Sequence, residues 1–374
     1  MNVLIWLLLL ALIAWAFERY YLRGHHVKYA APADPEAYMR FANSESSRAE
    51  QLAIVRAVTE LTFRITTNLH KKNLKAARSV FDDISAGRDY ESRFVPTDAN
   101  GIPAEWVIAP GADSARRVLY IHGGGFVMGS PKSHRPMTSK FSEITDSAVL
   151  AIDYRMMPEH KLVDCVEDCR TAYQWILENG PGGPEKIQRL YIAGDSAGGN
   201  LTLSLIAWIR DKKLRAPEAA VALSPLTDTT FSGASIRSNE SSDIMLKPFL
   251  KILNKIPQFI KSWWVVWKYR VRPANPIASP LLGDLSGLPP TLVQASETEM
   301  LLDDARRYAF KAHASGSPVK LQTWADMVHI WHIFEPQLPQ AVEAWEEIGK
   351  YLKAVTQSDQ ETSDQFLTES SVGS

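Results

Sequence analysis

A serine with glycines on either side follows an apolar run near the middle of the chain. Residues 190–193 read Leu-Tyr-Ile-Ala, and residues 194–199 read Gly-Asp-Ser-Ala-Gly-Gly. A Gly-x-Ser-x-Gly sequence between a strand and a helix is typical of a nucleophile elbow, in which glycines allow the sharp turn that exposes the serine hydroxyl. The sequence therefore predicts Ser196 as a nucleophile, with the N–H of Ala197 directed at developing negative charge. The alternative is a glycine-rich turn that contains an incidental serine.

A second glycine motif lies upstream, again after an apolar run. The run Val-Leu-Tyr-Ile precedes residues 122–126, which read His-Gly-Gly-Gly-Phe. Successive glycines let the main chain approach a substrate closely, and their N–H groups can stabilise the oxyanion that forms when a carbonyl is attacked. The sequence therefore predicts an oxyanion hole whose residues are Gly123, Gly124, Gly125 and Ala197. In this hypothesis Gly123 shapes the loop and the other three residues donate their N–H groups.

These motifs occur in the order of a known family, and further short motifs extend the similarity over residues 95–351. The chain resembles the hormone-sensitive-lipase-like branch of the α/β-hydrolases. The additional matching residues are Asp153-Tyr154-Arg155, Pro158-Glu159-His160, Ser279-Pro280-Leu281-Leu282, Leu288-Pro289-Pro290 and His329. The resemblance implies an α/β-hydrolase fold with a mostly parallel eight-stranded sheet, flanking helices and a helical cap. It also implies hydrolysis of carboxylic esters with short or medium acyl chains, without a metal or cofactor.

A serine nucleophile needs a base, and the base needs an acid that orients it. In α/β-hydrolases the histidine base comes last in the chain, on a loop after the final strand. His329 follows a predicted strand at residues 319–324 and takes the family's position for the base. We interpret the nearby His332 as a structural histidine. Chain order excludes His122 and His134 as bases, and we expect His122 to brace the oxyanion loop.

The acid is predicted in the loop after a strand at residues 291–296. The family commonly has Asp-Pro-Leu-x-Asp here, and residues 299–303 of this chain read Glu-Met-Leu-Leu-Asp. Matched residue by residue, Glu299 takes the acid position and keeps the charge of the commoner aspartate on a longer side chain. Two alternatives remain open. One is Asp303, whose charge could instead complement the dipole of the following helix, and the other is Asp228, which follows another predicted strand.

The whole chain has the size and composition of one large folded enzyme. It has 374 residues, of which 45% are hydrophobic, and its formal net charge of −1 favours no nucleic-acid partner. Apolar runs alternate with helical stretches over residues 91–355, which we predict to be the hydrolase domain with a cap insertion at about 235–272. Residues 25–90 are predicted to form helices that contribute to the cap. Residues 356–374 are predicted to be a disordered tail.

The N-terminus differs in character from the rest of the chain. Residues 3–17 carry no charge and would rise about 22 Å as a helix, which is short for a bilayer core of about 30 Å. We predict that residues 1–24 form a single-pass anchor in contact with membrane lipid, an arrangement reminiscent of arylacetamide-deacetylase-type enzymes. A cleaved signal peptide remains an alternative, as does an apolar helix docked on the domain or in an oligomer interface.

The charges that flank the apolar run predict the side of the membrane on which the enzyme lies. Arg19, Arg23, Lys28 and Arg40 follow the run, and no basic residue precedes it. The positive-inside rule then places the catalytic domain in the cytoplasm. The missing basic residues before the run also argue against a signal peptide.

A basic and aromatic segment lies within the predicted cap. Residues 247–272 carry seven basic residues and no acidic residue, interleaved with aromatic and aliphatic side chains. One interpretation is a cap whose apolar face roofs the acyl pocket while its lysines are solvated. The other is an interfacial helix that seats the cap on anionic lipid.

Together these patterns predict a serine carboxylesterase that hydrolyses a small-molecule ester through an acyl-enzyme, with no cofactor. Within enzymes, the alternatives are a membrane-associated lipid deacylase and an amide deacetylase. From another class, the chain could be a ligand receptor on a hydrolase frame, as the plant gibberellin receptors are. Those receptors lack a working base, whereas this chain retains His329. The sequence is compatible with a homo-oligomer.

Overall fold

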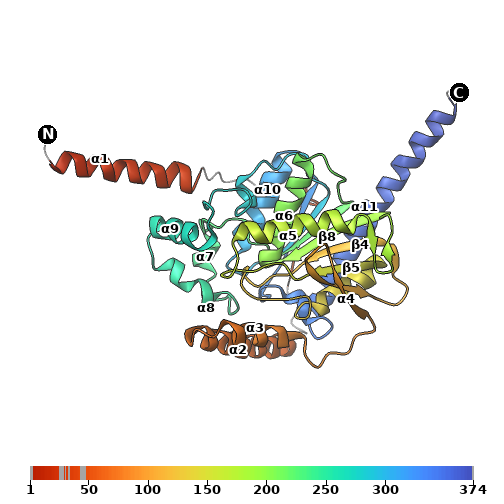
Figure 1. The fold of residues 1–374 in the computed structure, drawn as a ribbon, viewed down its shortest axis with the longest axis horizontal. Coiled ribbons are helices and arrows are strands. Elements are labelled where there is room, and N and C mark those ends of the chain that lie inside the picture. The colour runs from red at the N-terminus through yellow and green to blue at the C-terminus, as the bar shows by residue number, and fades with distance from the viewer. Residues whose placement is uncertain (1–2, 25–28, 30, 33, 43–47, 373–374) are drawn as a thin grey trace.

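The computed structural model describes residues 3–24, 29, 31–32, 34–42 and 48–372. Among them, nine strands form a central sheet in the order β1-β11-β10-β9-β8-β4-β5-β3-β2 (Figure 1). These strands are β1 (Tyr38–Phe41), β2 (Arg93–Asp98), β3 (Pro103–Ile108), β4 (Asp113–Ile121), β5 (Ser147–Ile152), β8 (Arg189–Asp195), β9 (Ala219–Leu223), β10 (Thr291–Ser296) and β11 (Val319–Trp324). A separate small hairpin pairs β6 (Asn179–Gly180) with β7 (Gly183–Pro184).

The sheet is mostly parallel, as the sequence predicts, but it has one more strand than the resemblance implies. The neighbours from β1 to β5 are parallel, and only the pairs β5–β3 and β3–β2 are antiparallel. The additional strand is β1, which lies in the region expected to hold only cap helices and pairs with β11 at the edge of the sheet. Its Phe41 stacks on Trp324 with ring centroids 4.2 Å apart, and this contact helps to hold the short strand in place.

The strands of the middle of the sheet are buried on both faces, which explains why their sequences are apolar throughout. In β4, Leu119 and Ile121 belong to one core cluster, whereas Val118 and Tyr120 belong to the other. The first cluster is covered by α5 (Leu162–Ile176), α6 (Ser196–Asp211) and α10 (Leu302–Ala314). The second is covered by α4 (Arg135–Thr145) and α11 (Pro339–Val372).

The helices in the regions predicted to form the cap come from two parts of the chain that are far apart in the sequence. Between β9 and β10 the chain forms α7 (Ser235–Ser238), α8 (Lys247–Leu250), η4 (Lys251–Asn254) and α9 (Gln258–Tyr269). Before β2 it forms α2 (Arg48–His70), α3 (Leu74–Asp82) and η3 (Asp83–Ser85). Ile65 and Ala77 pack with Met128 and Phe249, so α2 and α3 contact both the loop after β4 and α8. Two further short helices, η5 (Pro280–Leu282) and η6 (Trp331–Phe334), flank β10 and β11.

The N-terminal helix projects away from the rest of the molecule (Figure 1). It comprises α1 (Val3–Ala16) and the π-helical turn η1 (Phe17–Leu22), and the segment Ile5–Leu22 is long and apolar enough to cross a membrane. The large apolar side chains of α1 are exposed, so the structure does not support a helix docked on its own domain. Glu18 and Leu22 are buried against the domain, which ends the exposed segment before residue 24. Lys28, one of the flanking basic residues, lies outside the described residues.

The C-terminal segment differs from the prediction of a disordered tail. Helix α11 runs from Pro339 to Val372, so residues 356–372 continue the helix that packs on the sheet (Figure 1). Gly349 lies inside the helix, and neither proline nor glycine occurs between it and Gly373, so residues 356–372 contain neither of the residues that most often end a helix.

Candidate active site

The turn at Ser196 joins the end of β8 to the start of α6. Ser196 has a φ angle of 53°, in the left-handed region that costs a residue other than glycine about 1–3 kcal/mol. A Cβ atom at Gly194 or Gly198 would meet the carbonyl oxygen of Ile121 on the neighbouring strand. The glycines are therefore required by the close packing of the turn, and the strained serine is of the kind found at functional sites.

Three side chains form a chain of hydrogen bonds at this turn. Nε2 of His329 lies 2.9 Å from Oγ of Ser196, and Nδ1 lies 2.8 Å from Oε2 of Glu299. Ser196 is 9% exposed, His329 2% and Glu299 0%. The three residues follow β8, β11 and β10, and the carboxyl ends of parallel strands meet at one edge of a sheet. The structure thus brings together the residues that the sequence proposes as nucleophile, base and acid.

The carboxylate of Glu299 controls the protonation of His329. Burial alone would lower the pKa of His329, but the hydrogen bond to Glu299 and the charge of Glu299 raise it above the ordinary value of 6.5. Burial raises the pKa of Glu299, while its hydrogen bond with His329 and the histidine charge oppose this rise. The buried pair therefore favours the protonated imidazole, which is the state that a base reaches when it takes a proton from serine.

The alternative acids have other partners. Asp228 forms a 2.9 Å ion pair with Arg307. Asp303 accepts a hydrogen bond of 2.9 Å from a backbone N–H at the start of α7. The ring nitrogen of His329 that an acid would contact is already bonded to Glu299. The geometry thus favours Glu299 among the three carboxylates.

Two other histidines near the site have structural surroundings. Nε2 of His332 lies 2.7 Å from the side-chain oxygen of Gln294, and burial lowers the pKa of His332 to about 3. His122 stacks on Tyr154 with ring centroids 4.3 Å apart, and burial followed by the charge of His134 lowers the pKa of His122 to about 3. Both rings are therefore neutral at ordinary pH and act as packing and hydrogen-bonding groups.

In the glycine loop after β4, the N–H of Gly123 differs from those of Gly124 and Gly125 in having a partner within the protein. The N–H of Gly123 donates a 3.0 Å hydrogen bond to Oδ1 of Asp195, so this N–H is not available to a substrate. Within the described part of the chain, the N–H groups of Gly124 and Gly125 have no hydrogen-bond acceptor. The N–H of Ala197 lies in the first turn of α6, where no carbonyl of the helix can accept from it. Three N–H groups are therefore left to bind an oxyanion.

Asp195 fastens the glycine loop, a role that sequence reasoning missed. Its Oδ1 accepts a 2.7 Å hydrogen bond from the hydroxyl of Tyr120 and lies 3.3 Å from Nε2 of His134. Burial alone would raise the pKa of Asp195, but the charge of His134 and the hydrogen bonds from His134 and Tyr120 hold it below its ordinary value. The signal was present, because Asp195 is the residue between Gly194 and Ser196 in the motif.

A second carboxylate that the sequence did not single out holds the loop after Glu299. Asp243 is buried in the cap insertion and accepts a 2.7 Å hydrogen bond from the backbone N–H of Met300. It also accepts hydrogen bonds from the N–H groups of Met245 and Leu246. Asp243 therefore couples the cap to the residue next to Glu299. No short motif surrounds it, so only the fold could identify it.

The last helix of the cap contacts the glycine loop directly. Tyr269, at the end of α9, meets Phe126 in an edge-on contact with ring centroids 5.8 Å apart. Val265 and Tyr269 are buried, which shows that this face of α9 points into the molecule. Helix α9 therefore lies against the side of the site that the glycine loop forms.

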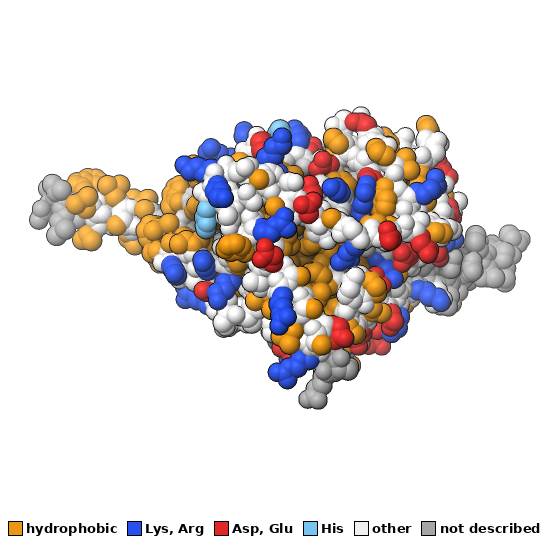
Figure 2. All heavy atoms as spheres, turned by 90° about the horizontal axis from the view of Figure 1, so that it is seen from below, with side chains coloured by type: hydrophobic (Ala, Val, Ile, Leu, Met, Phe, Trp, Pro, Cys, Tyr) orange, Lys and Arg blue, Asp and Glu red, His pale blue; other side chains and the backbone are white. Residues whose placement is uncertain are grey.

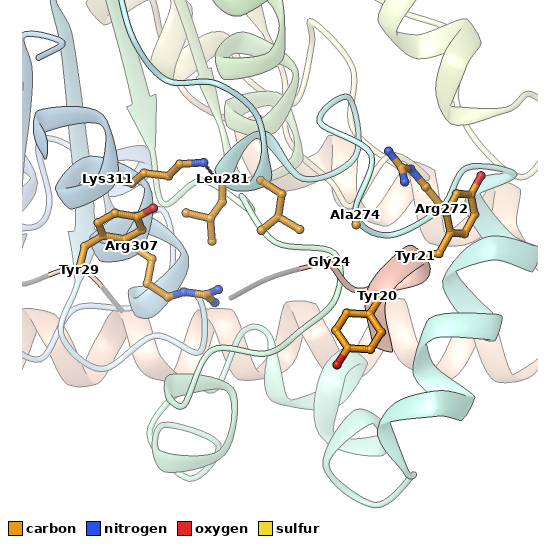
Figure 3. Close-up of a pocket in the computed structure, with 10 residues that line it drawn as sticks. Tyr20, Tyr21, Gly24, Tyr29, Arg272, Ala274, Leu281, Arg307 and Lys311 are labelled. Atoms are coloured by element: carbon orange, nitrogen blue, oxygen red, sulfur yellow. Dashed lines mark hydrogen bonds between the residues drawn. The ribbon is translucent and has the colours of Figure 1, made fainter. Parts of the chain in front are cut away.

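A cavity of about 300 Å³ lies at the root of the N-terminal helix. It lies away from the hydrogen-bonded relay formed by Ser196, His329 and Glu299. Figure 3 shows Arg307 and Lys311 of α10 on one side of it, and Tyr20, Tyr21 and Arg272 on the other. Its remaining lining residues are Gly24, Tyr29, Ala274, Leu281 and Leu282. The cavity lies between the root of the helix and α10, and none of its lining residues is Ser196, His329 or Glu299.

The comparisons with known proteins agree with this geometry. A family profile described as alpha/beta hydrolase fold matches residues 118–333. The chain belongs to the α/β-hydrolase family. An acetyl-hydrolase of Streptomyces hygroscopicus is 37% identical to this hydrolase over 254 residues, which make up 68% of this chain and 80% of that protein. The carboxylesterase/phospholipase LipF of Mycobacterium tuberculosis is 34% identical over 259 residues, 68% of this chain and 67% of its own.

Similar solved structures indicate which branch of the α/β-hydrolases this chain resembles. The crystal structure of an esterase from the bacterial hormone-sensitive lipase family has a TM-score of 0.69 and 33% identity, covering 84% of this chain and 99% of that one. The crystal structure of EstE5 soaked with p-nitrophenyl butyrate has a TM-score of 0.69 and 32% identity, covering 82% of this chain and 98% of that one. The predicted resemblance to hormone-sensitive-lipase-like hydrolases is confirmed. The family match begins at residue 118, so the N-terminal helix lies outside it.

Proposed function

We propose that this carboxylic ester hydrolase acts through an acyl-enzyme formed on Ser196. The observation that carries the proposal is the unbroken line of hydrogen bonds from Ser196 through His329 to Glu299. As Oγ of Ser196 attacks the ester carbonyl carbon, His329 takes the hydroxyl proton and Glu299 stabilises the imidazolium. The names of the relatives, which include esterases, an acetyl-hydrolase and a carboxylesterase, support this reaction class.

The attacked carbonyl oxygen becomes negatively charged and needs hydrogen-bond donors. In our proposal the N–H groups of Gly124, Gly125 and Ala197 supply them, while Asp195 holds Gly123 and thereby the loop. Each donor of this kind is typically worth about 10²- to 10³-fold in kcat, because it binds the charge more strongly in the transition state than in the substrate.

Collapse of the tetrahedral intermediate breaks the bond between the carbonyl carbon and the alcohol oxygen. His329 gives its proton to the leaving alcohol, and the acyl group remains on Oγ of Ser196. A water molecule then gives a proton to His329 and attacks the acyl carbon. Ser196 recovers its proton from His329 as the carboxylic acid leaves, which returns the enzyme to its starting state.

We also propose that the N-terminal helix anchors the enzyme in a membrane, with the catalytic domain on the cytoplasmic side. The proposal is supported by the exposure of the apolar side chains of α1 and by the length of the segment Ile5–Leu22. The basic residues Arg19, Arg23 and Arg40 follow the apolar run and none precedes it, which favours a cytoplasmic domain.

The reaction is tested on detergent-solubilised full-length protein with a series of p-nitrophenyl esters of increasing acyl length. Ser196→Ala should abolish turnover across the series, because loss of a triad nucleophile costs several orders of magnitude in kcat. Ser204→Ala, in the same helix, is the matched control and should keep most of the activity. If Ser196→Ala retained more than a small fraction of wild-type turnover, the assignment of the nucleophile would be wrong.

A further inference from the structure

Helix α9 and the turn before it carry an apolar face that is exposed rather than packed. We define the cap face as Ile252, Phe259, Ile260, Trp263 and Trp267, all of which are exposed. Trp263 is 51% exposed and Trp267 65%. The opposite face of α9 is buried, as Ser262, Val265 and Tyr269 show. Since a soluble protein rarely exposes neighbouring tryptophans, an apolar surface of this kind marks a site of contact.

The cap face adjoins the root of the N-terminal helix. Phe17 stacks on Trp263 with ring centroids 6.1 Å apart. The hydroxyl of Ser262 donates a 2.8 Å hydrogen bond to Oε1 of Glu18, which also lies 3.0 Å from Nε of Arg23. These contacts fix the position of α9 relative to the root of the helix. Figure 2 shows the apolar surface of the projecting helix continuing onto the body where the two meet.

Basic side chains surround the cap face. Lys251, Lys255 and Arg270 are exposed, and the guanidinium of Arg272 lies 4.9 Å from the ring of Tyr21. The segment 247–272 contains no acidic residue, so nothing within it offsets this charge. Lys and Arg side chains are visible beside the apolar surface in Figure 2. Tryptophans flanked by lysine and arginine are typical of surfaces that lie at the boundary between headgroups and acyl chains.

We propose that the cap face rests on the surface of a lipid bilayer that contains anionic headgroups. The proposal rests on the anchoring proposed above, because the contacts of Phe17 and Glu18 hold α9 at the point where the anchor leaves the protein. The bilayer would cover the tryptophans, and the basic residues would contact the headgroups. Because Tyr269 on the inner face of α9 contacts Phe126, one helix then separates the bilayer from the oxyanion loop.

The test places an environment-sensitive NBD probe on a cysteine at position 267 of the full-length protein in vesicles. Trp267→Cys carries the probe on the cap face, and Arg93→Cys is the matched control on β2, the strand at the other end of the sheet from β1. The native thiols will not compete, because Cys165 and Cys169 are buried and burial raises the pKa of Cys165 to about 12. Phe259→Cys repeats the measurement should Trp267→Cys fold poorly.

Vesicles of phosphatidylcholine with phosphatidylglycerol are compared with phosphatidylcholine alone, each with and without doxyl-labelled lipid. We expect blue-shifted emission and doxyl quenching at position 267 but not at position 93. The quenching should be stronger with phosphatidylglycerol and should weaken as salt is added.

Three results would overturn the proposal. Emission at position 267 that matches position 93 in vesicles that float with the protein would show the cap face to be in water. A blue shift without doxyl quenching would mean that a second copy of the chain covers it. If the protein did not float with the vesicles, both the proposed anchor and the proposed lipid contact of the cap face would be wrong. Esterase activity is measured separately, so loss of turnover with quenching intact would count against the proposed reaction alone.

Discussion

The surroundings of Ser196 and those of the N-terminal helix depart in opposite ways from the usual distribution of side chains. Around Ser196 the carboxylates of Asp195, Glu299 and Asp243 are buried, each with hydrogen-bond partners. Around the N-terminal helix large apolar side chains are exposed. Buried charges persist only where specific partners hold them, and exposed apolar patches mark contact surfaces. The difference suggests that the first region carries the chemistry and the second decides where it takes place, so changes in each should affect different measurements.

The largest effect among these tests should come from the acid. Glu299→Gln should lower kcat by roughly 10³- to 10⁴-fold with little change in KM, because a neutral amide cannot stabilise the imidazolium. Asp303→Asn is the matched control and should cost far less, since Asp303 bonds to the backbone of α7. Steady-state kinetics on a soluble ester measure both. If Asp303→Asn were the more damaging change, the acid would lie one helical turn further on.

A smaller loss should follow when the glycine loop is loosened. Asp195→Asn should lower kcat by roughly 10²-fold, because it weakens the hold on Gly123 and misplaces the adjacent donors. Tyr120→Phe removes only one hydrogen bond to Asp195 and should cost less. Thermal unfolding is measured in parallel. If Asp195→Asn lowered the melting temperature but left kcat unchanged, Asp195 would serve the fold and not the oxyanion hole.

The pH dependence of kcat/KM tests whether Glu299 raises the pKa of His329. His329 must be neutral to accept a proton, so kcat/KM should rise with pH as the protonated ring is titrated. Because Glu299 raises the pKa of His329, the midpoint should lie above 6.5. Removing the charge in Glu299→Gln removes the cause of this rise, and the midpoint of the residual activity should move to lower pH. A midpoint that stays in place would mean that Glu299 does not act on His329.

The N-terminal helix should tolerate a deletion, whereas the surroundings of Ser196 should not. A chain that lacks residues 2–16 should leave the membrane fraction and keep kcat on soluble short-chain esters within about twofold, since no relay or oxyanion residue lies there. This deletion retains Glu18 and Leu22, which are buried against the domain. Removing residues 2–24 should in addition lower the melting temperature. Fractionation and calorimetry measure these changes, and lost turnover in the shorter deletion would contradict the separation of roles.

The smallest effect should come from the cap face. Trp263→Ser combined with Trp267→Ser should raise KM a few-fold for an ester dissolved in vesicles, because apolar contact with lipid is reduced. It should leave kcat for a soluble ester unchanged. Phe63→Ser on α2 is the matched control, since Phe63 and Trp267 are both 65% exposed. The same rise in KM with both esters would place the tryptophans at the acyl pocket rather than at the membrane.

The sequence could predict the elements of the site because short motifs mark the ends of strands. The glycines around Ser196 and the late position of His329 follow from how an α/β-hydrolase is assembled, and the structure brings both together with Glu299. Their catalytic roles stay predictions until the variants are measured. The family and the mostly parallel sheet are confirmed. Both could be predicted because the motifs, and the alternation of apolar runs with helical stretches, extend over most of the chain.

Features that depend on distant contacts could not be predicted. The sequence assigns Gly123 to shaping the loop, but it does not reveal that the side chain of Asp195 holds the N–H of Gly123. Strand β1 has only four residues, too few to show the alternation of apolar and polar side chains that marks a strand, and its pairing depends on the position of β11. Asp243 acts on the loop of Glu299 from within the cap, where no local pattern marks it. In each case the determining contact joins segments that lie far apart in the sequence.

Labelling with a fluorophosphonate, followed by mass spectrometry of the labelled peptide, tests the central claim most directly. The reagent phosphonylates a serine only where a base and an oxyanion site activate it. We predict one adduct, on Ser196, in the full-length protein and in the chain that lacks residues 2–16, with labelling greatly slowed in His329→Ala. An adduct on another residue, or labelling of Ser196→Ala at the rate of the unaltered protein, would contradict the account.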